Sequence, residues 1–223
     1  MAEDEAASTR LSIPMTFRTL LPPTVATFET REDMLDVTLF PSEAHSLGRA
    51  VEKRRREFIT GRACARAALA HLGFDPVAIA TGSYGEPLWP AGIVGSITHC
   101  RGYRASAVAN VDEHGAIGID AEVHAPLPAG VLEVVASPHE RARLRGAGEL
   151  QLDRALFSAK ESIYKAWFGL TGDRLGFEDA DVTLDARDGT FEARLTGLRD
   201  LQGSWCVADG VVLTALVIAK ETP

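Results

Sequence analysis

Two helical segments, each followed by short strand-like runs, most constrain the fold of this chain. Residues 52–72 are rich in Arg and Ala, carry apolar residues at helical spacing and stop before Gly73. Residues 150–170 repeat the helical pattern. The strand-like runs lie at 93–98, 105–111 and 116–123 after the first helix, and at 181–184, 191–195, 205–208 and 211–218 after the second. This order predicts an α+β chain.

A faint internal repeat links the two helices. In each, an anchoring Phe is followed by cations one and two turns further on: Phe58 by Arg62 and Arg66, and, about 100 residues later, Phe157 by Lys160 and Lys165. Two similar halves with a ligand between them would explain the match, although chance can also produce so short a repeat.

Turn-forming residues place the loops. Residues 81–90 are punctuated by Gly and Pro and indicate a loop that leads into the sheet. Residues 112–115 are typical of a turn, so we expect 105–111 and 116–123 to form a hairpin. Ser137, Pro138 and Glu140 predict the start of a short helix that ends near Arg145.

Composition and charge limit the function. The chain has 223 residues, of which 46% are hydrophobic, so a sizeable core is expected. The net charge of -8 argues against a general nucleic-acid binder. The basic residues gather locally, at 53–56 and at Arg62 and Arg66, which suits a small phosphorylated ligand better than a polymer.

The cysteines and the termini suggest a compartment. Three widely spaced cysteines match neither a disulfide framework nor paired zinc ligands, which favours a reducing cytoplasm. The N-terminus lacks a signal-peptide pattern, and the longest apolar run, 210–219, is too short to span a bilayer, so we expect a soluble protein with no membrane partner. Residues 1–12 are expected to form a disordered leader.

Asp120 and Glu122 are the first candidates for chemistry. On a strand their side chains project to the same face, while Ile119 and Ala121 face the other way into the core. Two adjacent carboxylates repel one another unless a cation or solvent relieves them, and hard oxygen ligands suit Mg2+. The competing interpretation is the solvated face of an edge strand.

The second candidate group lies on the helix at 157–167. Glu161 and Lys165 are four residues apart and share a face, with Lys160 about 100° away from Glu161. An ordinary exposed ion pair would have the same spacing. Apolar residues occupy most of the circumference of this helix, however, which indicates that the helix is largely buried and that its few polar residues have a function.

Together, residues 118–122 (GIDAE) and 157–165 (FSAKESIYK) resemble the signature pair of the Sfp/EntD-type 4'-phosphopantetheinyl transferases, and most closely its actinobacterial members. The resemblance runs from about Arg54 to Ala219 through RRREF at 54–58, EPLWP at 86–90 and GSITHC at 95–100. It implies the 4'-phosphopantetheinyl transferase fold, with α+β halves at 13–112 and 113–223 related by a pseudo-twofold axis and coenzyme A between them.

The resemblance also implies roles for particular residues. Three carboxylates, Asp120, Glu122 and Glu161, would hold Mg2+, with Mn2+ as a possible substitute. The coenzyme A contacts would be Arg54, Arg62, Thr98, His99, Lys160 and Asp120. Glu161 would be the catalytic base, directly or through a metal-bound water, assisted by Lys160 and Lys165. The chain would transfer 4'-phosphopantetheine to a serine of an apo acyl or peptidyl carrier protein.

One departure from the family pattern concerns the loop. Many members carry Lys or Arg before the loop proline, where this chain has Glu86, which puts the contribution of the loop to coenzyme A binding in doubt.

For the carrier protein, the candidate docking segment is residues 127–145, which are first apolar and then basic. A helix packed on its own core fits this pattern equally well. One chain can build the whole site, so a monomer is expected.

Two other functions would use the same residues. A Mg2+-dependent phosphohydrolase of coenzyme A needs the carboxylates and the lysine but no carrier protein. A catalytically silent coenzyme A-binding module needs the arginine cluster but not Glu161.

Overall fold

The computed structural model describes residues 16–145, 152–195 and 200–220, so the leader predicted at 1–12 lies outside the described residues. Its elements in chain order are α1 (Phe17–Leu20), β1 (Ala26–Thr30), α2 (Pro41–Leu47), α3 (Glu52–His71), β2 (Ala80–Thr81), β3 (Pro87–Leu88), β4 (Ile93–Cys100), β5 (Tyr103–Asn110), β6 (His114–Val123), α4 (Val131–Val135), α5 (Pro138–Leu144), α6 (Leu152–Thr171), the 3-10 helix η1 (Phe177–Asp179), β7 (Ala180–Asp185), β8 (Thr190–Leu195), β9 (Leu201–Ala208) and β10 (Val211–Ala219). The predicted α+β class is confirmed.

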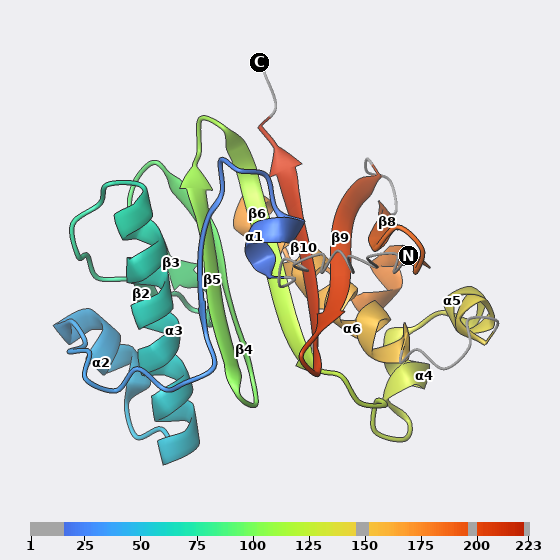
Figure 1. The fold of residues 1–223 in the computed structure, drawn as a ribbon, viewed down its shortest axis with the longest axis horizontal. Coiled ribbons are helices and arrows are strands. Elements are labelled where there is room, and N and C mark those ends of the chain that lie inside the picture. The colour runs from blue at the N-terminus through green and yellow to red at the C-terminus, as the bar shows by residue number, and fades with distance from the viewer. Residues whose placement is uncertain (1–15, 146–151, 196–199, 221–223) are drawn as a thin grey trace, which may run out of the picture.

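The N-terminal part is helix α3 packed on a three-stranded antiparallel sheet in the order β1-β5-β4 (Figure 1). The small side chains Ala65 and Ala68, with Leu69, are fully buried on the helix face that contacts Val108 of the sheet. The helix ends at a Gly73 whose φ is +83°, a conformation that glycine adopts without strain. The helix predicted at 52–72 is therefore confirmed.

The C-terminal part is a five-stranded antiparallel sheet in the order β6-β10-β9-β8-β7. Helix α6 lies behind β6 and β10 in Figure 1, and the short α1 lies in front of β10. Helix and strand approach closely at Gly118, where a Cβ atom would stand 1.9 Å from the carbonyl oxygen of Ser162. The absence of a side chain at Gly118 thus sets the distance between β6 and α6.

Strands β4 and β6 join the two sheets through side chains. The Ser96 hydroxyl accepts a hydrogen bond from the Ile119 amide at 3.2 Å, and the Thr98 hydroxyl accepts one from the Ala121 amide at 3.0 Å. The predicted hairpin of 105–111 and 116–123 is wrong: β5 pairs with β1 and β4, whereas β6 pairs with β10. The turn between β5 and β6 leads to the second sheet, and β6 could not pair with β5 because β1 and β4 occupy both of its edges.

Helix α5 begins as the sequence predicts. Ser137 Oγ accepts from the Glu140 amide at 3.2 Å and the Glu140 carboxylate accepts from the Ser137 amide at 2.7 Å, with Pro138 in the first turn. The four predicted C-terminal strands are confirmed, and β9 begins earlier than predicted, at Leu201. The sequence did not predict α1, β1, α2 or α4, which are seven residues or shorter.

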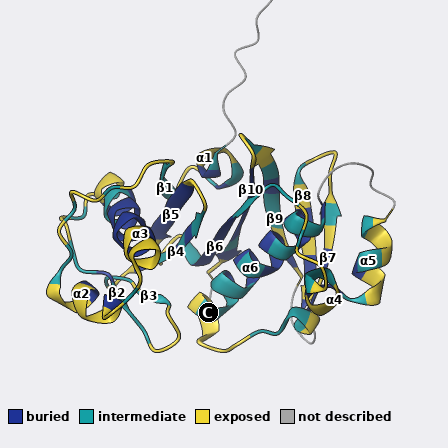
Figure 2. Ribbon diagram, turned by 90° about the horizontal axis from the view of Figure 1, so that it is seen from below, coloured by how far each residue is buried: buried dark blue, intermediate teal, exposed yellow. Residues whose placement is uncertain are grey.

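The core extends across the junction of the two sheets, and Figure 2 shows buried residues on α3, on α6 and on the strands that each helix covers. One buried cluster combines residues of α1, β5, β6 and β10: Phe17, Tyr103, Ala105, Ala107, Ala109, Ile117, Ile119, Ala121, Val211, Leu213 and Ala215. No helix of the described residues is long and apolar enough to cross a membrane.

Candidate active site

Asp120 lies at the centre of a buried polar cluster between β6, β4 and α6. Its Oδ1 accepts a hydrogen bond from Lys165 Nζ at 2.6 Å and from the Thr98 hydroxyl at 3.2 Å, and its Oδ2 accepts from Ser158 Oγ at 2.8 Å. Only 5% of Asp120 is exposed. This carboxylate is therefore fixed in position by three side chains from β4 and α6, one of which is a cation.

Glu122 shares the face of Asp120, as the alternation of β6 predicts, while Ile119 and Ala121 lie in the core. Its Oε2 accepts from Arg154 Nη1 at 3.0 Å. Burial raises the pKa of Glu122, Asp120 raises it further and Arg154 opposes both. The half-buried Glu122 thus lies between another carboxylate and a guanidinium.

Arg154 was missed in the sequence. Besides Glu122, its guanidinium donates to the carbonyl oxygens of Ala125 and Pro126, both at 2.9 Å, and so joins α6 to the loop after β6. A signal was present, because 154, 158, 161 and 165 follow one face of α6 at helical spacing. From that row, Arg154, Ser158 and Lys165 donate hydrogen bonds to the β6 carboxylates.

Glu161 is the third carboxylate. Burial raises its pKa, Asp120 raises it further, and Lys165 lowers it. No hydrogen bond or ion pair holds the Glu161 side chain within residues 16–145, 152–195 and 200–220. A carboxylate in this position is open to a proton or to a cation, and its raised pKa makes it a better proton acceptor than an ordinary glutamate.

The donor set suits a hard divalent cation in its chemistry, because the three carboxylates are oxygen donors that interact and two of them have raised pKa values. The described residues do not, however, form a ready-made group of three or more metal-ligating side chains. Lys165 and Arg154 are the present partners of Asp120 and Glu122, and a cation among the carboxylates would compete with them.

Lys160 lies apart from this cluster. It is 4% exposed, and its Nζ donates to Glu140 Oε2 at 2.9 Å and to the Phe177 carbonyl oxygen at 2.7 Å. The same Glu140 carboxylate accepts the Val182 amide. Lys160 therefore joins α6 to α5, η1 and β7, and the structure does not bring it to Asp120.

Arg54 and His99 lie together at the end of β4. Arg54 Nη1 is 3.0 Å from His99 Nε2, and His99 Nδ1 is 3.7 Å from Glu57 Oε2. Burial lowers the pKa of His99; Glu57 raises it, whereas Arg54 and Lys165 lower it. Because His99 follows Thr98, which donates to Asp120, this basic group is next to the carboxylates.

Arg62, predicted to contact coenzyme A, is 5% exposed. Its Nε donates to the Ile79 carbonyl oxygen at 2.6 Å, its Nη2 donates to Thr81 Oγ1 at 2.9 Å, and its guanidinium lies 4.4 Å from the centre of the Phe58 ring. Burial lowers the pKa of Arg62 to about 10. In this structure Arg62 fixes the base of the β2–β3 hairpin.

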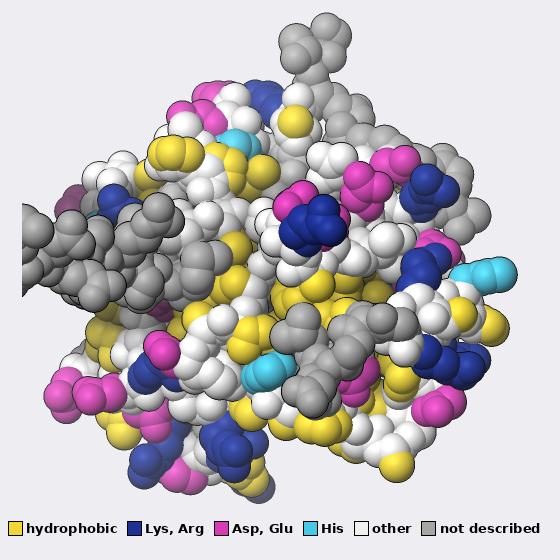
Figure 3. All heavy atoms as spheres, turned by 45° about the vertical axis from the view of Figure 1, so that its right-hand side comes forward, with side chains coloured by type: hydrophobic (Ala, Val, Ile, Leu, Met, Phe, Trp, Pro, Cys, Tyr) yellow, Lys and Arg dark blue, Asp and Glu magenta, His cyan; other side chains and the backbone are white. Residues whose placement is uncertain are grey.

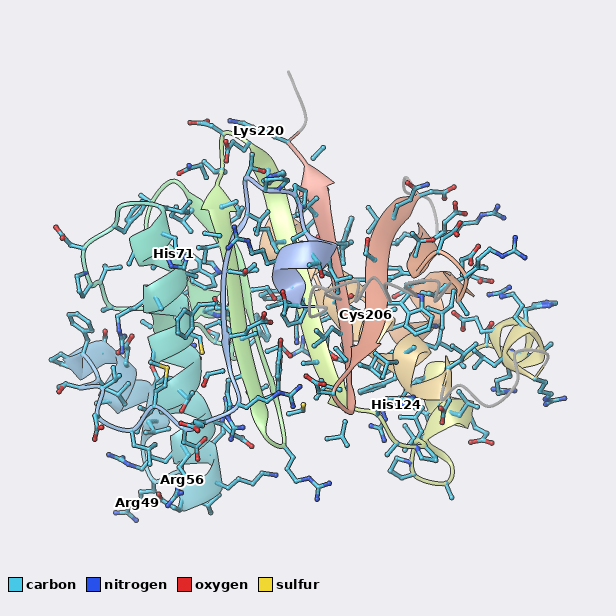
Figure 4. The ribbon with its side chains drawn as sticks, in the orientation of Figure 1. Arg49, Arg56, His71, His124, Cys206 and Lys220 are labelled. Atoms are coloured by element: carbon cyan, nitrogen blue, oxygen red, sulfur yellow. The ribbon has the colours of Figure 1, made fainter. Side chains whose placement is uncertain are left out.

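Further arginines lie at the surface of the N-terminal part. Arg49 and Arg56 lie at the N-terminal end of α3 in Figure 4. Arg56 is paired with Glu52 at 2.9 Å and with Asp33 at 3.8 Å. On the face drawn in Figure 3, basic and acidic side chains are interspersed, so that face is not a broad basic surface.

A cavity of about 540 Å³ opens beside the carboxylates, between the β2–β3 hairpin, β4 and α6. Trp89 forms one wall and donates from Nε1 to the Gly95 carbonyl oxygen at 3.0 Å; a Cβ atom at Gly95 would stand 2.8 Å from its ring. The lining residues are Tyr84, Gly85, Glu86, Pro87, Leu88, Trp89, Ile93, Val94, Gly95, Ser96, Ile97, Ala116, Ile117, Glu161, Tyr164, Lys165, Phe168 and Gly169. It is the size of a small-molecule site.

Glu86 turns back onto its own loop. Its Oε2 accepts from the Tyr84 amide at 2.9 Å, and its carbonyl oxygen accepts from the Gly82 amide at 2.8 Å. In this chain the acid before the loop proline therefore closes the hairpin turn.

The candidate docking segment is partly engaged in the fold. Val134 is 74% exposed, whereas Val135 is buried. Arg141 donates to the Ala136 carbonyl oxygen at 2.6 Å, and Arg143 pairs with Asp181. The Val134 side chain of α4 is thus exposed to solvent, whereas Arg141 and Arg143 are engaged in contacts that hold α5 in place.

Carboxylates and cations beside a small-molecule cavity define a site suited to a phosphorylated ligand and a divalent cation. Comparison with protein families matches residues 42–109 to the 4'-phosphopantetheinyl transferase N-terminal domain and residues 116–217 to the 4'-phosphopantetheinyl transferase superfamily. The chain belongs to the 4'-phosphopantetheinyl transferase family and is a transferase.

Individual relatives agree. The chain is 48% identical over 219 residues to 4'-phosphopantetheinyl transferase Npt of Nocardia iowensis, an alignment that covers 90% of this chain and 99% of that protein. It is 46% identical over 218 residues to 4'-phosphopantetheinyl transferase PptT of Mycobacterium tuberculosis, covering 89% and 96%. Enterobactin synthase component D of Salmonella typhimurium is 36% identical over 187 residues, covering 78% and 76%.

Proposed function

We propose that the chain transfers the 4'-phosphopantetheine group of coenzyme A to a serine of apo acyl or peptidyl carrier proteins, with Glu161 at the reaction centre. The serine oxygen bonds to the β-phosphorus, the bond from that phosphorus to the bridging oxygen breaks, and 3',5'-ADP leaves with the electron pair. The observation that carries the proposal is a cavity that ends at Glu161 and Lys165, beside Asp120.

The cavity suits the pantetheine arm of the donor. Its walls are largely apolar, from Trp89, Ile97, Tyr164 and Phe168, and Ser96 and Glu161 supply polar groups. With the arm in the cavity, the pyrophosphate lies beside Lys165 and the nucleotide end lies toward Arg54 and His99. Arg54 and His99 are the phosphate contacts that this placement favours.

Asp120, Glu122 and Glu161 would hold Mg2+, or Mn2+ in its place. When bound, such an ion supplies charge neutralisation at the phosphate oxygens. Lys165, four residues after Glu161, would contribute positive charge on the same side. Arg154 would keep Glu122 oriented through the hydrogen bond seen in the structure.

Glu161 is the proposed base, directly or through a metal-bound water, because burial raises its pKa above that of an ordinary carboxylate and its side chain is not held by a hydrogen bond or ion pair among the described residues. Lys165, already bonded to Asp120, would orient the two carboxylates. Lys160 and Arg62 would act indirectly in this scheme, by holding α6 and the hairpin in place.

The carrier protein would approach α4 and the open end of the cavity. Val134 is the exposed apolar contact that the 127–145 segment offers.

One chain supplies every residue of the proposed site, so a monomer is sufficient. The proposed boundary between the two halves, 112/113, lies in the turn between β5 of the first sheet and β6 of the second.

The experiment is intact-mass analysis of an apo carrier incubated with the protein, coenzyme A and Mg2+. The proposal predicts a mass gain of one phosphopantetheine that disappears with EDTA and returns with Mg2+ or Mn2+. A carrier with its serine replaced by alanine is the matched control. Absence of any gain with several unrelated carriers, despite coenzyme A binding, would reject the proposal.

A further inference from the structure

The tip of the β2–β3 hairpin reaches across the cavity to α6. The ring of Tyr84 meets the ring of Phe168 edge-on, with centroids 5.6 Å apart, and Phe168 stacks on Tyr164 at 6.0 Å. The guanidinium of Arg174, from the loop after α6, lies 4.7 Å from the centre of the Tyr84 ring. We name Tyr84, Phe168 and Arg174 the clasp.

The hairpin that carries Tyr84 is fixed at its base and lightly held at its tip. Arg62 fixes the base through Ile79 and Thr81. Its two strands pair over only two residues each, and so short a ladder is weak without further support. Tyr84 itself is 61% exposed, so the clasp contacts are its main attachment to the C-terminal part.

The cavity follows one face of α6 from the reaction centre to the clasp. Glu161, Tyr164, Lys165 and Phe168 all line it. Glu161 and Phe168 are seven residues apart, which is about 10 Å along a helix. Tyr84 and Phe168 of the clasp therefore line the end of the cavity that lies away from the carboxylates.

The length of the pantetheine arm brings its sulfur to this end. About thirteen bonds separate the β-phosphorus from the sulfur, and a chain of that many bonds extends roughly 15 Å at ordinary bond lengths and angles. An arm whose phosphorus lies beside Lys165 thus places its thiol at or beyond Phe168, against the Tyr84 ring.

We propose that Tyr84 determines which thioesters of coenzyme A the enzyme accepts, because its ring closes the cavity where an acyl group on the sulfur would lie. This inference rests on the proposed function. Free coenzyme A fits with the clasp closed, whereas a long acyl chain must displace Tyr84 from Phe168. The ligand class concerned is an acyl thioester of coenzyme A.

The test compares coenzyme A with hexanoyl-coenzyme A as donors to one apo carrier, for the wild type, Tyr84→Ala, Tyr84→Phe and Leu170→Ala. The readout is the ratio of kcat/KM for the two donors, from the masses of the modified carrier. Calorimetric binding of both donors gives the corresponding affinity ratio even where turnover is slow. Leu170 is exposed and does not line the cavity, so it is the matched control.

We expect Tyr84→Ala to raise the hexanoyl-to-free ratio at least tenfold, because the barrier to the acyl chain is removed. Tyr84→Phe keeps the ring and should retain the wild-type ratio, as should Leu170→Ala. A Tyr84→Ala ratio within twofold of the wild type, in turnover or in binding, would overturn the role of Tyr84. A wild type that transfers nothing from free coenzyme A would instead refute the proposed function.

Discussion

The polar residues of this site divide into those that face the substrate cavity and those that hold the fold together. Glu161 and Lys165 line the cavity. Lys160 and Arg62 are almost completely buried against partners of their own. Charge and position in the sequence do not separate these two groups. The cavity lining separates them, because it includes Glu161 and Lys165 but neither Lys160 nor Arg62.

Glu161→Gln should abolish most transfer without unfolding the protein. The amide keeps the shape of the side chain but cannot accept the serine proton, and removal of a general base typically costs about 10²–10⁴-fold in rate. The measurement is kcat for carrier modification, with thermal unfolding as a check on folding. Glu192→Gln, an exposed position on β8, is the control. Retention of a tenth of wild-type kcat would contradict the assignment.

Lys160→Met and Lys165→Met should separate stability from activity. Loss of Lys160 leaves the buried Glu140 without its cation, which typically costs about 3–5 kcal/mol. Loss of Lys165 also removes the cation beside Asp120, but the Lys165–Asp120 pair is less buried than the Lys160–Glu140 pair, so it should cost less stability and, because the amine lies at the cavity, should mainly lower kcat. Denaturant unfolding and kcat measured on both variants test this. A Lys160→Met protein of normal stability but low activity would restore Lys160 to the phosphate site.

His99 should make stability depend on pH. Burial, Arg54, Arg104 and Lys165 lower the pKa of His99 in the folded chain, and only Glu57 opposes them. The unfolded chain therefore binds this proton more readily, so stability is lost as the pH falls from the unfolded value, about 6.5, through the lower folded value. Its contribution is fully present above the unfolded value.

The measurement is the free energy of unfolding between pH 7.5 and pH 5, for the wild type and for His99→Gln. The variant should lose less stability over this range, because the side chain that must be charged is gone. Equal losses in the two proteins would mean that His99 titrates alike in the folded and unfolded chains.

At the scale of elements, the contact between β6 and α6 decides the geometry of the site. Gly118 permits it, because any side chain at this position would meet the backbone of Ser162. The same approach places Lys165 on Asp120. The glycine that opens the GIDAE segment is therefore a packing requirement for the chemistry two residues later.

Gly118→Ala should destabilise the protein by about 1–3 kcal/mol, since the added methyl group can be accommodated only by moving α6. Gly169→Ala is the matched control. It lies in α6, and no atom stands within 4 Å of the place that its new methyl group would take, so the change should be neutral or stabilising by up to about 1 kcal/mol. Denaturant titration measures both, and equal stabilities would contradict the packing argument.

Long elements with strong periodicity could be predicted from the sequence, and short ones could not. Helix α3 follows from its Arg and Ala-rich pattern and its glycine stop. Helices α1 and α4 are held by tertiary contacts of Phe17 and Val135 rather than by local pattern. The pairing of β6 with β10 joins segments about 90 residues apart, so a local turn signal favoured the wrong hairpin.

The sequence predicted which residue types form the candidate site, but it did not predict most of their hydrogen-bond partners. Alternation on β6 predicted that Asp120 and Glu122 share a face, and spacing on α6 predicted the same for Glu161 and Lys165; the family resemblance, not the spacing, brought Glu161 to the two β6 carboxylates. The partners of Lys160 and Arg154 come from loops and from other elements, which helix spacing cannot reveal. Burial of Arg62 likewise depends on the path of the chain at 79–81.

The whole molecule should behave as one folding unit, because the cluster around Ile119 takes residues from both sheets and from α1. Residues 13–112 or 113–223 expressed alone should therefore fail to fold, since each would expose half of a buried cluster. Circular dichroism and amide NMR dispersion test the separate halves. A well-dispersed spectrum from either half would show that the shared cluster is dispensable.

Carrier modification is distinguished from hydrolysis by simultaneous measurement of modified carrier and released 3',5'-ADP in one reaction with wild-type protein, coenzyme A and Mg2+. A transferase predicts one 3',5'-ADP for each carrier modified, and none without the carrier. Release of 3',5'-ADP at the same rate with the carrier omitted would show that water is the acceptor, and would contradict the assignment of the site to carrier modification.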